Sequence, residues 1–422
     1  MNPITSQSCC SDENEAGTLS VKQALDNMLN SLNEQTGQEQ VSLCDAVDRV
    51  LAQAITSPIN VPAHRNSAVD GYAIMHADLP RNGQQASLKV IAQVVAGHPY
   101  RGALNPGEAI QIMTGAQMPE LADTVIMQEH IERDGQMIRF DARHSAGQNV
   151  RQPGEDIQSG QVVLAAGIKL SPPQVGLIAS LGQTEVCVKA PLTVAVFSTG
   201  DEILSIGDAA HEGCIYDSNR YSLLAALKKL GCHTLDMGVI PDQPDQLRKA
   251  FTVAADSADV IFTSGGVSVG EADYTKQVLA ETGDINFWKV AIKPGRPIAF
   301  GKINNAIFFG LPGNPVAVMV TFYQFALPCL EKLMGLQQPL LSPTIEVKCS
   351  HPIRKLAGRT EIQRGILSQQ ADGQWQVSTT GQQGSGVLRS MSDANAFIIL
   401  SHDREMVGAG EYVTVQVFAS LF

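Results

Sequence analysis

The chain has eight cysteines but no Cys-x-x-Cys pair. Zinc sites and dithiol redox motifs commonly use that spacing, so neither kind of site is expected. Disulfide frameworks are typical of small secreted domains and have no support in a chain of 422 residues with scattered cysteines. We therefore expect most cysteines to be small buried apolar side chains.

Basic charge is also scarce. The chain has 30 lysines and arginines against 42 aspartates and glutamates, which gives a formal net charge of -12. Nucleic acids and anionic membranes are bound by outward-facing basic surfaces, so we expect neither as a partner. An anionic small molecule remains compatible with this charge if a local basic cluster or a metal ion binds it.

Neither a secretion signal nor a membrane-spanning segment is visible. Residues 1–18 have no apolar stretch, and the first lysine is Lys22. The longest apolar run, near residues 315–330, is interrupted by Gln324 and is expected to be a buried helix too short to span a bilayer. These features indicate a cytoplasmic protein.

The length of 422 residues predicts three or four domains. Residues 1–57 and 151–188 are expected to form a discontinuous first domain of helical or mixed structure. Residues 58–150 would be a β-rich domain inserted into it. Residues 189–338 alternate strand and helix, which predicts a central doubly wound α/β domain. Residues 339–422 are rich in strands and predict a C-terminal β-barrel or sandwich, of which we adopt the barrel.

Local signals support this division. Ser20 precedes apolar residues at helical spacing and is expected to cap a helix, and a second helical pattern follows over residues 47–51. In the inserted domain, Asp134-Gly135 between two apolar residues predicts a hairpin.

A glycine-rich loop, residues 264–270 (Ser-Gly-Gly-Val-Ser-Val-Gly), follows an apolar strand and precedes a predicted helix. Glycines at such a position let backbone N–H groups approach an anion, and the helix N-terminus adds a favourable dipole. An ordinary tight turn is the alternative. The segment also matches the nucleophile elbow of α/β-hydrolases, but that elbow places its serine at the strand end, whereas this strand is expected to stop at Thr263, well before Ser268.

Three cations lie close to one another after that loop. Lys289 and Lys293 share one face of a predicted strand under period-two alternation, and Arg296 follows in the next loop. A solvated edge face is one interpretation. In an acidic protein, beside a glycine loop, the same residues fit a clamp for a phosphate or another oxyanion.

Carboxylates cluster at the predicted strand ends. Each one could be a cap or turn residue, and Asp217 before Ser218-Asn219 has that character. Together around an anion pocket they could hold Mg²⁺, which uses few carboxylates plus ligand oxygens. These residues are Asp201, Glu202, Asp217, Asp242, Glu271 and Asp273. No Walker A and no Gly-x-Gly-x-x-Gly motif occurs, which argues against a P-loop NTPase or an ordinary dinucleotide enzyme.

Several short segments along the chain closely resemble, in the same order, segments of the molybdopterin molybdenumtransferases. This family includes MoeA and the E domain of gephyrin. In the α/β region the matching segments are Ser198-Thr-Gly-Asp-Glu202, Asp217-Ser-Asn-Arg220, Ser264 to Tyr274, Ile292-Lys-Pro-Gly-Arg-Pro297 and Leu311-Pro-Gly-Asn-Pro315. Elsewhere they are Asn66-Ser-Ala-Val-Asp-Gly-Tyr-Ala73, Ile112-Met-Thr-Gly115, Gly154-Glu-Asp156, Glu361-Ile-Gln-Arg-Gly365 and Gly381 to Gly386. The resemblance covers the chain from about residue 19 to its end.

The resemblance implies an elongated homodimer of four-domain subunits, with a molybdopterin-binding α/β domain. Its active site would lie at the subunit interface, between the α/β domain of one subunit and the second domain of the other. The implied reaction inserts molybdenum from molybdate into adenylylated molybdopterin and releases AMP, the last step of molybdenum-cofactor synthesis. Further implied partners are the molybdopterin adenylyltransferase and the enzymes that accept the finished cofactor.

Residue roles carry over by position. The implied catalytic residues are Asp70, Thr114, Asp156, Glu202, Asp242 and Asp273, of which Glu202, Asp242 and Asp273 would bind Mg²⁺. The implied substrate-binding residues are Asp217, Asn219, Gly265, Gly266, Ser268, Lys289, Lys293, Arg296, Pro312, Arg364 and Ser385.

The chain departs from the family pattern at two positions. Arg65 stands where the family usually has Asp, which could alter metal affinity or form a local salt bridge. Arg296 stands where many relatives have Lys, so the charge is kept but the hydrogen-bond geometry changes.

Two other functions share this fold. The α/β domain alone also occurs in molybdopterin adenylyltransferases, and gephyrin uses the fold in a scaffold that clusters receptors. The complete second and fourth domains argue against the first alternative. Retention of Asp70, Glu202, Asp273 and Lys293 argues against the second.

Overall fold

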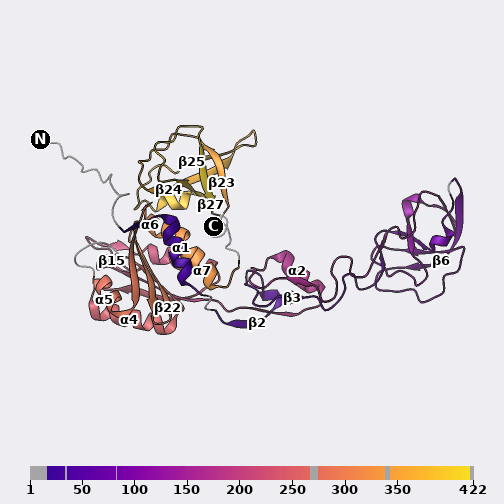
Figure 1. The fold of residues 1–422 in the computed structure, drawn as a ribbon, viewed down its shortest axis with the longest axis horizontal. Helices are drawn as coiled ribbons and strands as arrows, with labels where there is room; N and C mark the ends of the chain where they lie inside the picture. Colours follow the sequence, from indigo (N-terminus) through magenta and orange to yellow (C-terminus); the bar gives the residue numbers. More distant parts are fainter. Residues whose placement is uncertain (1–16, 34–35, 82, 267–273, 338–342, 419–422) are drawn as a thin grey trace.

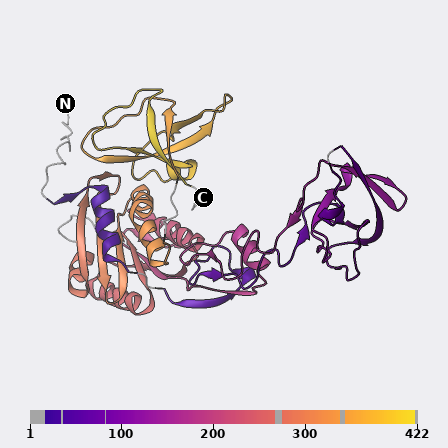
Figure 2. The ribbon, with the colours of Figure 1, turned by 45° about the vertical axis from the view of Figure 1, so that its right-hand side comes forward.

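The computed structural model describes residues 17–33, 36–81, 83–266, 274–337 and 343–418. The molecule is elongated (Figure 1): an α/β domain and a C-terminal barrel lie at one end, and a β-rich domain lies at the other. Figure 2 shows the same separation after a 45° turn. Ser268 and Asp273, predicted above as site residues, lie outside the described residues.

The α/β domain is built on a seven-stranded sheet of order β1-β19-β21-β22-β18-β14-β17. Its strands are β1 (Thr18–Leu19), β14 (Thr193–Thr199), β17 (His233–Ile240), β18 (Val260–Ser264), β19 (Asp284–Val290), β21 (Pro297–Ile303) and β22 (Ala306–Leu311). Strands β17, β14, β18 and β22 are parallel, whereas β21 runs antiparallel to both of its neighbours. The central strands β14, β18 and β22 are buried almost throughout because helices cover both faces, which confirms the predicted doubly wound class.

Helices cover the sheet in two layers. They are α1 (Val21–Ser31), α3 (Asn219–Lys229), α4 (Pro244–Ser257), α5 (Tyr274–Thr282), α6 (Pro315–Thr321) and α7 (Leu327–Leu333), with the π-helical turn η5 (Phe322–Ala326) between the last two. One face of the sheet packs with α1, α3, α6, η5 and α7, and the other packs with α4 and α5. Phe262 of β18 and Phe309 of β22 stack on the first face with ring centroids 5.0 Å apart.

A single long helix runs through the core. It spans Pro315–Leu333, 19 residues, and 83% of its most apolar window is buried inside the protein. The expectation that this run is too short to cross a membrane was wrong on length, but its burial fits the expected core helix. The π-helical turn lies just before Pro328, because proline has no N–H and its ring would clash with the carbonyl of Gln324 in a regular helix.

The N-terminal helix differs from the expectation. Ser20 caps α1 as predicted, and its side chain accepts from the backbone of Gln23. The sequence analysis assigned this helix to the first domain, but Ala24, Met28 and Leu32 belong to the core of the α/β domain. Strand β1 just before it also pairs with β19, so local pattern alone could not show its tertiary partner.

The first domain lies between the α/β domain and the β-rich domain (Figure 1). It contains the strands β2 (Gln38–Ser42), β3 (Ile55–Thr56), β12 (Val162–Leu164) and β13 (Glu185–Lys189), the 3₁₀ turn η2 (Leu43–Asp45) and α2 (Pro172–Ser180). Strand β2 pairs with β13 and β3 with β12, so the two chain segments form one small core. The second helical pattern predicted over residues 47–51 was wrong, because these residues form turns and isolated bridges instead.

The β-rich domain contains a six-stranded sheet of order β8-β5-β7-β6-β10-β9. Its elements are β4 (Asn66–Ser67), β5 (Gly71–Ile74), η3 (His76–Asp78), β6 (Gln85–Val94), β7 (Glu108–Ile112), β8 (Thr124–Met127), η4 (Gln128–His130), β9 (Glu132–Asp134), β10 (Met137–Asp141) and β11 (Val150–Arg151). The hairpin predicted at Asp134-Gly135 joins β9 to β10. Both faces of the sheet carry apolar clusters made only of residues 69–150.

The C-terminal domain is a five-stranded barrel. It consists of β23 (Thr344–Cys349), β24 (Thr360–Gln369), β25 (Trp375–Thr379), β26 (Ala396–Leu400) and β27 (Tyr412–Val417), with α8 (Arg389–Asp393). Pairing of β24 with both β25 and β26 closes the sheet on itself, which confirms the predicted barrel. The short strand β20 (Ile292–Lys293) of the α/β domain adds to the barrel by pairing with β24.

The aromatic stack should dominate the stability of the α/β domain. Phe262 is fully buried and also contacts Phe322, with ring centroids 6.0 Å apart. We expect Phe262→Ala to lower the free energy of unfolding by about 3–5 kcal/mol through lost burial and the cavity left behind. Urea denaturation followed by tryptophan fluorescence measures this change. Val253→Ala, on the exposed side of α4, is the control and should change stability by less than about 0.5 kcal/mol; equal effects would contradict the assignment.

Candidate functional site

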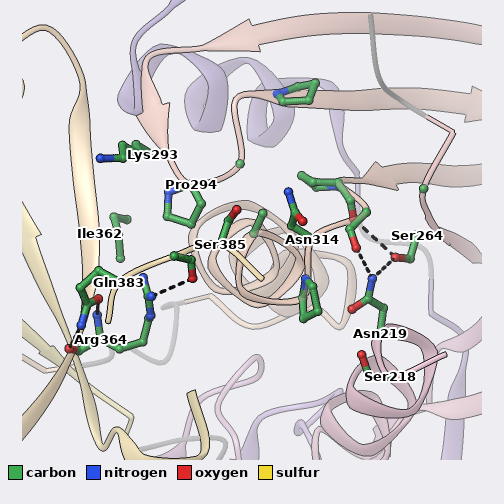
Figure 3. Close-up of a pocket in the computed structure, with 18 of the residues that line it drawn as sticks. Ser218, Asn219, Ser264, Lys293, Pro294, Asn314, Ile362, Arg364, Gln383 and Ser385 are labelled. Atoms are coloured by element: carbon green, nitrogen blue, oxygen red, sulfur yellow. Dashed lines mark hydrogen bonds between the residues drawn. The ribbon is translucent and has the colours of Figure 1, made fainter. Parts of the chain in front are cut away.

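A cavity of about 1170 Å³ lies at the carboxyl ends of β14 and β18. The chain passes from β14 to β17 on one side and returns to β18 on the other, so this is the switch point of the sheet, where α/β domains bind ligands. The barrel forms the opposite wall, with residues such as Ile362, Arg364 and Gln383 (Figure 3).

Predicted substrate-binding residues converge on this cavity. Those that line it are Asp217, Asn219, Gly265, Gly266, Lys293, Pro312, Arg364 and Ser385. Two predicted cations, Lys289 and Arg296, are not among the lining residues. The predicted strand does not run through residue 293: β19 ends at Val290 and Lys293 belongs to β20, so Lys289 and Lys293 pair with different sheets.

The glycine loop needs its glycines. Gly265 and Gly266 have φ of +94° and +65°, a region that side chains rarely adopt. A Cβ on Gly265 would lie 2.7 Å from the Thr199 carbonyl, and one on Gly266 would lie 2.5 Å from the Thr275 hydroxyl. The close approach of this loop to β14 therefore excludes any larger residue.

Asn219 joins the two loops that form the floor of the cavity. Its side-chain amide donates to the Ser264 hydroxyl at 2.8 Å and to the Gly313 carbonyl at 2.7 Å (Figure 3). Its carbonyl oxygen is buried without a hydrogen-bond partner among the described residues. Asn219 is thus fixed by two donated bonds and keeps one acceptor unused.

Asp217 is an ion-pair partner as well as a cap. It accepts from the backbone N–H of Arg220 at 3.1 Å and from the Arg220 guanidinium at 2.8 Å. Both side chains are almost fully buried, and Arg220 also bonds to Asp236. Because its charge is already matched, Asp217 supports the start of α3 rather than offering a free carboxylate to a ligand.

Arg364 places a buried positive charge in the cavity wall. It is 1% exposed, and its guanidinium donates to the Ser390 hydroxyl at 3.0 Å and to the Gly384 carbonyl at 3.1 Å, both neutral groups. Burial lowers the pKa of Arg364 to about 10, and the charge of Glu361 partly opposes that change. In the described part of the chain no carboxylate forms an ion pair with Arg364. An anion in the cavity would supply the missing counter-charge.

The loop that carries Ser385 is fixed between barrel and helix. The Ser385 carbonyl accepts from the backbone N–H of Val316 in the first turn of α6. Gln383 accepts from the backbone N–H of Arg364 at 2.8 Å and donates to the Arg364 carbonyl at 3.1 Å. Asn314 holds the N-cap position of α6, but its side chain makes no capping hydrogen bond.

Two predicted metal ligands, Glu202 and Asp242, line the same cavity. The Glu202 carboxylate folds back over Gly200, and the backbone N–H of Asp242 donates to Asp201 at 3.3 Å. Carboxylate oxygens suit Mg²⁺, which completes its shell with ligand oxygens and water. Within the described ranges no group of three or more acidic, His or Cys side chains forms a metal site, and the third predicted ligand, Asp273, lies outside them.

Three family profiles match successive parts of the chain. They are the MoeA N-terminal region (domain I and II) over residues 19–182, a probable molybdopterin binding domain over residues 195–332, and the MoeA C-terminal region (domain IV) over residues 346–418. A molybdopterin molybdenumtransferase of Haemophilus influenzae is 44% identical over 405 residues, which cover 96% of this chain and 99% of that protein. The chain belongs to the MoeA family.

Two further likenesses support this assignment to the MoeA family. A crystal structure of a molybdopterin biosynthesis MoeA protein from Pyrococcus horikoshii has a TM-score of 0.83 at 29% identity, and covers 95% of this chain and 100% of that one. Gephyrin of Dictyostelium discoideum is 31% identical over 89% of this chain but only 58% of gephyrin. That protein is therefore much longer than the region it shares with this chain.

The remaining residues implied by membership of the MoeA family lie away from the cavity. Asp70, Thr114 and Asp156 are not among its lining residues. Asp70 and Thr114 belong to the β-rich domain, which lies at the opposite end of the molecule from the α/β domain and the barrel (Figures 1 and 2). The Thr114 hydroxyl and N–H both donate to Asp70, at 2.6 and 2.7 Å, and these hydrogen bonds lower the pKa of Asp70. One chain alone therefore does not bring the two groups of predicted catalytic residues together.

The departure at Arg65 has a local explanation. Its guanidinium donates to the carbonyls of Ala122 at 3.1 Å and Glu120 at 2.8 Å. Arg65 therefore fastens the loop before β8 through neutral carbonyls. These contacts account for the arginine without a changed metal site or a salt bridge, the two consequences predicted above.

Several polar residues of the barrel wall were not among the predicted site residues. Glu361 and Gln363 are buried, 8% and 4% exposed, on strand β24, and Arg354 lines the cavity from the loop before it. A strand with alternating polar residues predicts an exposed polar face, so the pattern gave no sign that these side chains turn inward. The buried polar side chains could be found only once the barrel was placed against the sheet.

Asn219→Asp tests whether the two floor loops depend on the amide. A carboxylate cannot donate to the Gly313 carbonyl and would face it with like charge, so we expect a loss of about 1–3 kcal/mol of stability. Thermal and urea denaturation measure the change. Asn33→Asp, at an exposed position, makes the same chemical change and should leave stability unaltered; a similar result for both variants would disprove the bridging role.

Proposed function

We propose that the protein inserts molybdenum from molybdate into adenylylated molybdopterin, with release of AMP. The observation that carries this proposal is the buried Arg364, whose charge has no paired carboxylate among the described residues, in the same cavity as Lys293, Glu202 and Asp242. Cations and hard oxygen donors together fit a substrate that contains both an oxyanion and a phosphoanhydride. The names of relatives such as the Haemophilus influenzae protein support the same reaction.

The two sides of the cavity would bind different parts of the substrates. On the barrel side, Arg364, Lys293 and the Ser385 loop would hold molybdate close to the dithiolene sulfurs. On the sheet side, the glycine loop and Asn219 would hold the pterin and nucleotide phosphates through backbone N–H groups and fixed polar atoms. Mg²⁺ held by Glu202 and Asp242 would polarise the phosphoanhydride oxygens. Two Mo–S bonds would form while one Mo–O bond breaks, and its oxygen would leave as water with the two dithiol protons. A water molecule would cleave the phosphoanhydride, so that AMP leaves and the pterin phosphate remains on the cofactor.

A homodimer would complete the site. Asp70 and Thr114 cannot reach the cavity of their own chain in this extended shape, so a second copy would have to bring its β-rich domain to it (Figure 1). The hydrogen bonds from Thr114 keep Asp70 ionised and oriented, as a residue that contacts a metal ion or a proton donor requires. A cytoplasmic location and transfer of the cofactor to acceptor enzymes stay predictions.

Two alternatives use the same fold. An adenylyltransferase would make adenylylated molybdopterin from ATP instead of consuming it, and it would not need the barrel wall with Arg364. A scaffold would bind a protein without turnover, and the match to part of gephyrin keeps this alternative open. The same assay separates all three.

The first experiment incubates the purified protein with adenylylated molybdopterin, Mg²⁺ and molybdate. AMP and active cofactor should appear in step, and Asp70→Ala or Glu202→Ala should lower both by about 100-fold or more, as removal of a transition-state contact does. Asp372→Ala, in an exposed turn of the barrel, is the control and should keep full activity. Synthesis of adenylylated molybdopterin from ATP would favour the adenylyltransferase, and no turnover by a folded protein would favour the scaffold.

Mixing two inactive variants tests the shared site. In a mixed dimer of Asp70→Ala and Glu202→Ala subunits, one site has both substitutions and the other has neither. Random exchange makes half of the dimers mixed, so activity should recover to about a quarter of the wild-type value. The measurement is turnover after co-refolding or co-expression with two affinity tags. Failure to recover activity in a purified mixed dimer would mean that each subunit uses its own Asp70.

A further inference from the structure

The barrel wall contains a buried acid that the proposed reaction does not use. Glu361 lies on β24, faces the cavity and is 8% exposed. A carboxylate in an anion-binding cavity repels the ligand, so its presence there needs a physical explanation.

Glu361 is held in place by a chain of polar contacts. The Gln363 amide donates to a Glu361 carboxylate oxygen at 2.9 Å and to the Arg354 carbonyl at 3.1 Å. Gln363 is itself 4% exposed, and both residues belong to β24, which pairs with β20, β25 and β26. The Glu361 carboxylate therefore has little freedom to move away from the cavity.

Lys293 is the flexible partner of this carboxylate. Its ammonium lies 3.4 Å from both Glu361 carboxylate oxygens, but its side chain is 54% exposed, against 10% for Glu361. The two residues are adjacent through backbone pairing, since β20 and β24 align Lys293 with Glu361. The buried acid on the barrel thus fixes the position of the more exposed cation on the α/β domain.

Arg364, three residues along the same strand, adds a second positive charge to the cavity wall. It has no paired carboxylate in the described part of the chain. The buried acid thus pairs with one of the two cations that face the same cavity from two domains. The three side chains carry a net charge of about +1 rather than +2.

We propose that Glu361 is a positioning residue for Lys293, and that its charge beside this cation keeps oxyanion binding weak. The inference rests on the proposed function for the identity of the anion. Tight binding of molybdate in the ground state would raise the barrier to its transfer, because only contacts that strengthen in the transition state accelerate the reaction. A fixed acid paired with Lys293 holds this cation in place and prevents that excess affinity.

The test compares direct molybdate binding by wild type, Glu361→Gln and Glu361→Asp in calorimetric titrations of the full-length protein. Glu361→Gln keeps the size of the side chain but removes its charge, so molybdate should bind about tenfold more tightly at low salt, and this gain should shrink in 0.5 M NaCl. Glu361→Asp keeps the charge and should bind within about twofold of wild type. Glu405→Gln removes an exposed acid outside the cavity and is the matched control.

Turnover gives a second readout. If Glu361 limits ground-state binding, Glu361→Gln should lower KM for molybdate and kcat together. A purely structural role would lower kcat and thermal stability without tightening binding. Lys293→Gln should weaken binding, and the double variant Lys293→Gln with Glu361→Gln should return towards the wild-type affinity, since the net charge of the cluster is restored. Unchanged or weaker molybdate binding by folded Glu361→Gln would overturn the proposal.

A measurement without molybdate separates this proposal from the proposed function. Reductive methylation followed by peptide mass spectrometry reports the accessibility of each lysine amine. Lys293 should react about twofold faster in Glu361→Gln because its ammonium is released from the carboxylate, with the exposed Lys302 as internal reference. Faster labelling without any molybdate binding by wild type would contradict the proposed substrate and leave the pairing intact. Unchanged labelling would contradict the pairing itself.

Discussion

The pairing of two residues, Ile292 and Lys293, with the start of strand β24 determines how the functional half of the molecule is arranged. Through it, a piece of the α/β domain becomes part of the barrel, and the barrel wall is held over the carboxyl edge of the sheet. The Ser385 carbonyl, bonded to the first turn of α6, fastens the same wall at a second point. Tyr323 of η5, packed against Phe397 and Phe418 of the C-terminal domain, fastens the wall at a third point.

The same joint explains why charge of both signs occurs in the cavity. The sheet side supplies Glu202 and Asp242 on loops, where side chains can adjust to a ligand. The barrel side supplies Arg364 and Glu361 on a strand, where backbone pairing and polar contacts fix them. A ligand with an oxyanion at one end and a phosphoanhydride at the other would place the oxyanion against the fixed barrel wall. Its phosphoanhydride would face the loops of the sheet side. Such a division suits a reaction in which one group is held still while its partner is cleaved.

The fold class could be read from the sequence because its signals are local. Alternating apolar strands and helices over residues 189–338 predicted the doubly wound sheet, and the Asp134-Gly135 turn predicted the β9–β10 hairpin of the β-rich domain. The partner of α1 could not be read, because a helix with an apolar stripe packs equally well on any apolar face, and its core residues show only in the folded chain. The helical pattern over residues 47–51 failed because short apolar spacings also occur in turns that fold onto a core.

The candidate site was predictable to a similar extent. Gly265, Gly266, Asn219, Lys293 and Arg364 could be named from the sequence because motifs carry them, and they line one cavity. Lys289 does not join them, because the strand breaks at Ala291 and the two lysines pair with different sheets. Glu361 and Gln363 could not be assigned, since a buried polar side chain on a strand has the same sequence pattern as an exposed one. Their environment arises from contacts between domains that no local pattern records.

The β-rich domain is connected to the rest of the molecule by two chain segments, which meet at the bridge between Val61 and Ile157. Mechanically this connection is a hinge at the base of a long lever, with the six-stranded sheet at its far end (Figure 2). Because two chain segments form this connection, it resists twisting of the β-rich domain about the long axis more than bending. A small angular change at the hinge is magnified into a large displacement of Asp70. Substitutions near Val61 would therefore change the position of the β-rich domain without contacting any ligand. The geometry of this short connection limits where Asp70 can be placed.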